Sequence, residues 1–377
     1  MKPVHSMHRR AAATAGRVSA GLVAARVAAG LIVALLLAAG LAGGLRRAGV
    51  DLPVVHAAGA HAALMIGGFF ATVIGVERAV ALRTRWAWAA PGATAAGGLC
   101  LVAGAYRDGA WLLAAGATLF VAASLEVLRR QRAAHTVTLL VAALCGLAGA
   151  LQWAAGVAGD AAAAAWLAFL VLTIAAERLE MTRLMRRRVG AQAAFAGCVV
   201  VMLIALPLIA VSPQLGGAVF GLALLALALW LGVNDIARVT ITASGLPRYM
   251  AVALLAGYAW LGVAGAAWLL AAAGWPARDA ALHAIGLGFV FSMVMAHAPV
   301  ILPAVAGVKL RFGPGFYLPL ALLHGSLALR LALGGADPRL LAAGAILNVA
   351  ALAVFALTLL HAAIAWRRTA TTGPSTS

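Results

Sequence analysis

The sequence predicts an all-α polytopic integral membrane protein with about twelve transmembrane helices. Of its 377 residues, 65% are apolar and 10% are charged, a composition too apolar for a soluble domain of this size. Unbroken apolar runs such as 31–44 and 220–233 differ from the alternating segments of a membrane β-barrel. A helical span takes about 20 residues, so this length accommodates roughly a dozen spans and no large domain outside the membrane.

Twelve apolar segments are expected to form the spans, and each is bounded by charged or turn-forming residues. We expect helices at 18–45, 54–76, 88–106, 110–128, 135–158, 161–177, 191–212, 214–233, 249–274, 281–306, 316–334 and 340–366. The first follows a basic tail, and we interpret it as a retained helix because its apolar run is long for a signal peptide. Pro299 and Pro303 should kink or end the tenth helix.

These spans divide the chain into a cytoplasmic tail at 1–17, a single transmembrane domain at 18–366 and a second cytoplasmic tail at 367–377. The tails and the loops on their side carry most of the 28 Lys and Arg residues, whereas the opposite loops carry only Arg46, Arg47, Arg107, Arg278 and Arg339. This asymmetry places both termini in the cytoplasm. The net charge of +18 therefore reflects membrane topology and contact with anionic lipid, and no nucleic-acid partner is needed to explain it.

An acidic residue followed by arginine recurs at the cytoplasmic helix ends about every 50 residues, and it predicts tandem two-helix repeats. Because an acid at a helix C-terminus is opposed by the helix dipole, we expect these residues to form interfacial ion pairs. A proton-relay or substrate role is the alternative. The residues of the pattern are Glu77, Arg78 and Arg83; Glu126 and Arg132; and Glu177, Arg178 and Arg183.

Five histidines within the predicted spans are the main candidates for a functional site. His56, His61 and His283 belong to the outer leaflet, and either His56 or His61 could face His283. His297 shares a helix face with His283 but lies about 21 Å further along the axis, so a second site is implied.

The second site would be formed by His297 and His324, with Met293 or Met295 as a soft ligand. Imidazole suits haem iron and copper, and a thioether suits Cu(I). The spacing therefore allows haem iron or copper to be bound at an outer and an inner site.

Two short motifs resemble the NnrS family. They are His61-Ala-Ala-Leu-Met65-Ile-Gly-Gly-Phe69 and His283-Ala-Ile-Gly-Leu-Gly288-Phe-Val-Phe-Ser-Met293. That family comprises polytopic bacterial membrane proteins associated with nitric-oxide stress and denitrification and described as binding haem and copper. The resemblance falls on His61 rather than His56, and it implies that His61 and His283 bind haem.

A wider similarity is to the haem–copper oxidase core, which has twelve helices and takes low-spin haem ligands from the second and the tenth. The other histidine motifs of that core are missing here, so respiratory oxygen reduction is not expected.

Three functions remain open. The first is an NnrS-like haem- and copper-binding protein of the bacterial inner membrane, acting in the nitric-oxide response, nitrosative stress or denitrification by binding nitric oxide or by electron transfer with a redox partner. The second is a twelve-helix secondary transporter. The third is an assembly factor that delivers haem or copper to another complex. Whether the protein is an enzyme stays open.

Overall fold

The described part of the chain is helical and contains no β-strand. The computed structural model describes residues 27–157, 159–184 and 188–371. Eleven helical segments within these ranges are long and apolar enough to cross a membrane, and large apolar side chains such as Leu31, Val200 and Leu229 are exposed on the outside of the bundle. The protein is therefore an all-α polytopic membrane protein, as predicted.

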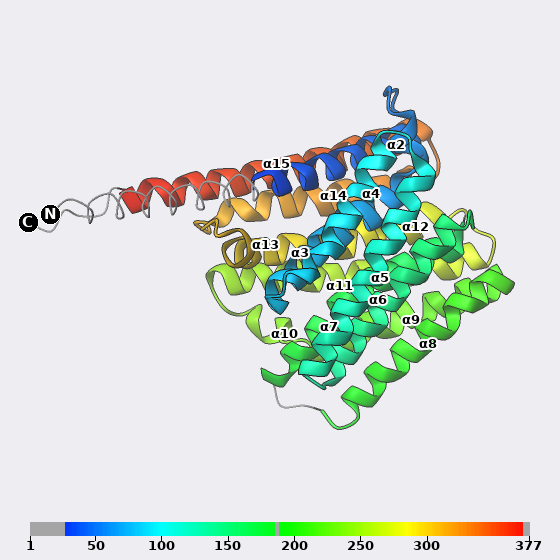
Figure 1. The fold of residues 1–377 in the computed structure, drawn as a ribbon, viewed down its shortest axis with the longest axis horizontal. Coiled ribbons are helices and arrows are strands. Elements are labelled where there is room, and N and C mark those ends of the chain that lie inside the picture. Colours follow the sequence, from blue (N-terminus) through cyan, green and yellow to red (C-terminus); the bar gives the residue numbers. More distant parts are fainter. Residues whose placement is uncertain (1–26, 158, 185–187, 372–377) are drawn as a thin grey trace, which may run out of the picture.

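The helices follow the predicted segments closely (Figure 1). The first runs over Val27–Arg47. The others are α2 (Val55–Gly59), α3 (Ala71–Leu82), α4 (Ala89–Val102), α5 (Tyr106–Arg130), α6 (Ala134–Ala154), α7 (Asp160–Met181), α8 (Ala191–Val211), α9 (Pro213–Asn234), α10 (Ala237–Thr240), α11 (Gly245–Ala272), α12 (Arg278–His283), α13 (Phe291–Ala306), α14 (Tyr317–Leu333) and α15 (Pro338–Thr371). Two π-helices, η1 (Ala63–Phe70) and η4 (Ala284–Val290), join α2 to α3 and α12 to α13, and short 3-10 turns are η2 (Trp86–Trp88), η3 (Thr182–Leu184) and η5 (Pro314–Phe316).

Several predicted boundaries are wrong. The largest difference is at the helix expected at 54–76, which continues to Leu82 at the end of α3. The segment expected at 88–106 is α4, whose 14 residues rise about 21 Å, less than the thickness of the hydrocarbon core. It is short because the chain turns at Arg83 and Gly104, both of which have a positive φ angle. At the other end, α15 continues to Thr371, beyond the predicted end at 366. The predicted tail at 1–17 and the start of the first span lie outside the described residues.

Helices adjacent in the sequence pack against each other as hairpins. α4 packs on α5, α6 on α7, α8 on α9 and α14 on α15. The tandem repetition of these hairpins stays a prediction. The free end of helix Val27–Arg47 and the C-terminal end of α15 lie at the same end of the bundle, at the left of Figure 1. A chain that crosses the membrane an even number of times has both ends on the same side. The position of these two ends in the cytoplasm stays a prediction.

Aromatic side chains at the two π-helices approach each other. Each π-helix begins one or two residues after a histidine, His283 or His61, and each histidine is followed eight residues later by a phenylalanine, Phe291 or Phe69. The His61 and His283 rings are 6.4 Å apart between centroids, and so are the Phe69 and Phe291 rings. α7 contacts both π-helices. Since π segments inside α-helices are frequent at functional sites, this part of the fold is a candidate position for a functional site.

Glycines let the first helix approach this pair closely. A Cβ at Gly43 would overlap the backbone carbonyl of Ala57. We expect Gly43→Val to lower the free energy of unfolding by about 3 kcal/mol, since backbone atoms cannot yield to an overpacked side chain. Gly30→Val is the matched control, because Gly30 is exposed on the same helix with no atom near its Cβ position. Thermal unfolding of the purified variants measures the difference, and equal stabilities would contradict the packing.

Candidate functional site

A cavity with a volume of about 530 Å³ lies beside the paired histidines. It is enclosed by helix Val27–Arg47, η1, α7, η4, α14 and α15. Its walls are mainly apolar and include Phe70, Trp166 and Phe291, and its polar lining includes His61, His283, Arg47, Asp279 and Arg330. An apolar cavity of this size with a few converging polar groups is typical of a small-molecule or cofactor site.

His61 is held with one ring nitrogen occupied. Its Nδ1 lies 2.7 Å from the carbonyl oxygen of Gly40, so we assign the proton to Nδ1, which donates to that carbonyl. The ring fits against the first helix because Gly44 has no side chain; a Cβ there would lie 2.8 Å from Cε1 of His61. This tautomer leaves Nε2 with a lone pair available to a ligand.

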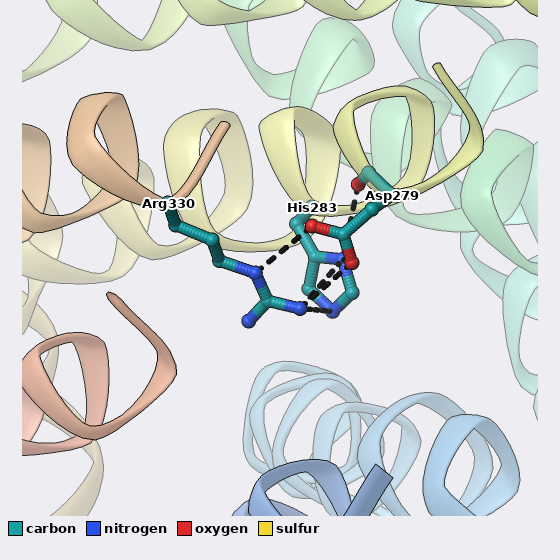
Figure 2. A network of polar contacts seen from close by, with 3 residues as sticks. All are labelled: Asp279, His283 and Arg330. Carbon is teal, nitrogen blue, oxygen red and sulfur yellow. Dashed lines mark hydrogen bonds and ion pairs between the residues drawn. The ribbon is translucent and has the colours of Figure 1, made fainter. Parts of the chain in front are cut away.

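His283 belongs to a partly buried polar triad with Asp279 and Arg330 (Figure 2). Its Nδ1 lies 2.9 Å from Oδ1 of Asp279 and 3.0 Å from the Asp279 carbonyl oxygen. Arg330 donates to both carboxylate oxygens of Asp279 at 2.8 and 3.0 Å, and its Nη2 lies 3.3 Å from Nε2 of His283. Asp279 thus fixes the proton on Nδ1, while Nε2 is an acceptor.

The two imidazoles therefore have the same tautomer. Both have Nδ1 tied to an oxygen and Nε2 as the acceptor, which is the arrangement that orients metal-binding histidines in proteins. The ring centroids are 6.4 Å apart and the ring planes differ by 24°. Arg330 donates two hydrogen bonds to the Asp279 carboxylate, so it stays paired whether or not Nε2 of His283 accepts a hydrogen bond from it. The pair and the apolar cavity beside it fit a flat, metal-containing cofactor.

A family model described as a domain of unknown function (DUF8744) matches residues 26–364. The chain belongs to this family. No curated protein and no solved structure gave a significant match. The DUF8744 match covers both histidines, both π-helices and every wall of the cavity.

In this DUF8744 protein His56 and His61 have different positions. His56 is exposed. The hydroxyl of Tyr106 donates to the His56 carbonyl at 3.0 Å and lies 3.4 Å from its Nδ1. His61 lines the cavity and faces His283. Of the three predicted outer histidines, the structure brings together only His61 and His283.

The predicted inner ligands each have different partners. His324 accepts a hydrogen bond at Nδ1 from Trp260 Nε1 at 2.8 Å, so its proton lies on Nε2, which then has no lone pair for a metal. His297 has its Nδ1 2.8 Å from the Met293 carbonyl oxygen, while the Met293 side chain packs against Gly257. Within the described ranges, no three His, Cys, Asp or Glu side chains are grouped closely enough to hold a metal.

Some residues of the acidic–arginine pattern have identified partners. Glu126 pairs with Arg130 at 2.9 Å. Arg178 lies 3.9 Å from Asp235, and Arg183 lies 3.2 Å from His135 Nδ1. These contacts follow the i,i+4 geometry of a helix and the packing between helices, which the repeated sequence offset does not encode.

Glu77 and Arg78 lie near the end of α3. Arg78 interacts electrostatically with Glu177 and Glu77 and lies 6.0 Å from the Phe120 ring centroid. Arg83 ends α3 in a left-handed conformation. Ion pairs that link helices through Glu77, Arg78 and Glu177 stay a prediction.

Asp279 and Arg330 are the site residues that sequence analysis missed. Arg330 is 8% exposed and lies inside a predicted span, where a charged residue marks a functional candidate by default. Asp279 precedes His283 by four residues, a spacing that places both side chains on one helix face. These two signals were present in the sequence and point to the triad.

Proposed function

We propose that this DUF8744 protein is a haem-binding protein of the bacterial inner membrane, with His61 and His283 as the two protein ligands of one haem. One observation carries the proposal: two histidines with identical tautomers lie 6.4 Å apart beside a cavity of about 530 Å³. The resemblance of the same two motifs to the NnrS family adds a role in the nitric-oxide response or denitrification. Held between two imidazoles, a haem supplies one-electron redox chemistry.

The residues around the two histidines and the cavity have different roles in this proposal. Gly40 and Asp279 keep His61 and His283 in the tautomer that offers Nε2, and they fix the ring orientations. Arg47 and Arg330 line the cavity and favour a ligand that carries negative charge. Phe70 and Phe291 close the cavity with apolar surface, which excludes water and lowers the local dielectric constant.

A visible absorption spectrum of the detergent-purified protein tests the proposal directly. We expect a reduced-minus-oxidised haem spectrum and about one iron per chain, because one pair of histidines holds one iron. Copper is expected below stoichiometric amounts, since His324 has no lone pair at Nε2 and the inner residues have different partners. A colourless, iron-free protein from cells supplied with haem would contradict the proposal.

A further inference from the structure

A second cavity, with a volume of about 350 Å³, lies among the end of α7, the start of α8, the end of α9 and α10. Its apolar walls include Leu179, Trp230 and Val233. It shares no lining residue with the cavity beside His61 and His283. Its volume is within the range of ligand pockets, roughly 300–1,000 Å³. The cavity is therefore a candidate binding site separate from the proposed haem site.

Hydrogen bonds between lining residues hold the walls of this second cavity in place. Nε1 of Trp230 donates to the Ala191 carbonyl at 2.7 Å, which ties α9 to the first residue of α8. Nδ2 of Asn234 donates to the Trp230 carbonyl at 2.9 Å, and the Thr182 hydroxyl donates to the Leu179 carbonyl at 2.7 Å. The packing of these helices thus builds the cavity, and its neutral polar side chains already have partners within the walls.

The charged side chains in the described lining of this cavity are arginines. Arg188 and Arg238 are both exposed, and the described lining contains no Asp or Glu. The acids nearest in the chain are elsewhere: Asp235 is fully buried, and Glu180 lies 3.5 Å from Nε2 of His135 on α6. The cavity is therefore positively charged.

This charge favours an anion that accepts several hydrogen bonds. A guanidinium has five N–H donors, and Arg238 donates from Nη1 to the Val233 carbonyl at 2.7 Å, which leaves further donors for a ligand. The planar fork of a guanidinium matches the oxygens of a phosphate group. A metal cation is disfavoured by the two positive charges. The chemistry of the lining thus points to a phosphate group.

We propose that this cavity binds the headgroup of an anionic phospholipid, with Arg188 and Arg238 contacting its phosphate. The cavity lies at the ends of helices long and apolar enough to cross a membrane, and basic pockets between transmembrane helices bind such headgroups. Leu229, next to Trp230 on α9, is 68% exposed, and Val200 on α8 is 53% exposed, so both helices offer apolar surface to acyl chains. This inference goes beyond haem binding and does not depend on it.

Binding of phosphatidylglycerol to the delipidated, detergent-purified full-length protein, measured by native mass spectrometry, tests this site. We expect Arg188→Ala and Arg238→Ala each to weaken binding roughly fivefold, the effect of one basic residue near an anionic lipid surface. Arg248→Ala is the matched control, because Arg248 is an exposed arginine of α11 outside the described lining. Equal weakening in Arg248→Ala would overturn the proposal, since overall charge would then account for the binding.

Two other probes, used on the wild-type protein, identify the ligand. Phosphatidylcholine, whose headgroup has no net charge, should bind more weakly than phosphatidylglycerol, and equal binding of the two lipids would overturn the proposal. Inorganic phosphate should compete only weakly with the lipid. Binding of inorganic phosphate as tight as that of phosphatidylglycerol would assign the site to a free phosphate and overturn the lipid assignment.

Electron cryo-microscopy of the wild-type protein in phosphatidylglycerol nanodiscs provides a measurement that needs no variant. We expect headgroup density within hydrogen-bond distance of Arg188 and Arg238. Protein side chains filling the cavity, or lipid density elsewhere and none between these arginines, would overturn the proposal. Since the measurement can be made on protein with or without haem, its failure is distinguishable from failure of the proposed function.

Discussion

His61→Ala is expected to abolish the haem spectrum of the purified protein, and His283→Ala is expected to do the same. Each substitution removes one of the two Nε2 atoms that face the cavity, and no neighbouring histidine replaces it, since His56 is exposed and bonded to Tyr106. The measurement is the reduced-minus-oxidised spectrum together with iron content, compared at equal protein concentration. We expect the haem content of either variant to fall to a few per cent of wild type.

His56→Ala is the matched control, because it removes a histidine from the same helix without touching the cavity. It should retain the full spectrum. If His56→Ala loses haem while His61→Ala retains it, the haem ligand is His56 and the assignment to His61 is wrong. Unchanged spectra in both His61→Ala and His283→Ala would place the haem elsewhere in the protein.

Asp279→Ala is expected to lower the free energy of unfolding by about 3–5 kcal/mol, the usual cost of leaving a buried charge without its partner. The Arg330 side chain is 9% exposed, whereas that of Asp279 is 40% exposed. Removing Asp279 therefore leaves a buried guanidinium unpaired, while Arg330→Ala leaves a carboxylate that water can reach. We expect Arg330→Ala to cost less, and the double variant to be more stable than Asp279→Ala alone.

Denaturant or thermal unfolding of the two single variants and the double variant measures this coupling. Asp160→Ala is the control, because Asp160 pairs with Arg278 at 2.8 Å but both side chains are largely exposed, so its loss should cost at most about 1 kcal/mol. Equal effects of Asp160→Ala and Asp279→Ala would contradict the role of the triad. Asp279→Ala should also weaken haem binding roughly 10–100-fold, because the Nδ1 proton of His283 loses its acceptor.

The helices were predictable because long apolar runs are determined locally by composition. The features that composition did not predict depend on packing in three dimensions. The shortening of α4 follows from left-handed turns at Arg83 and Gly104, and the π segments after His61 and His283 follow from how two helices fit together. Neither appears as a change in hydropathy.

The candidate site was predictable in part. The spacing on one helix predicts a common face for His283 and His297, which stays a prediction, and the motif resemblance selected His61. The contact between His61 and His283 could not be derived from one sequence, because helices far apart in the chain need not be neighbours. The approach of Arg178 to Asp235 across the bundle is outside the sequence pattern for the same reason.

The phenylalanines that come eight residues after His61 and His283 also bear on the movement of charge. Phe69, Phe70 and Phe291 pack together, with Phe70 and Phe291 tilted at a centroid distance of 5.4 Å. An apolar layer of this kind has a low dielectric constant, so a charge inside it is poorly solvated. Moving one elementary charge through a full 100 mV requires about 2.3 kcal/mol. An electron or proton that crossed the bilayer past this layer would therefore be coupled to the membrane voltage.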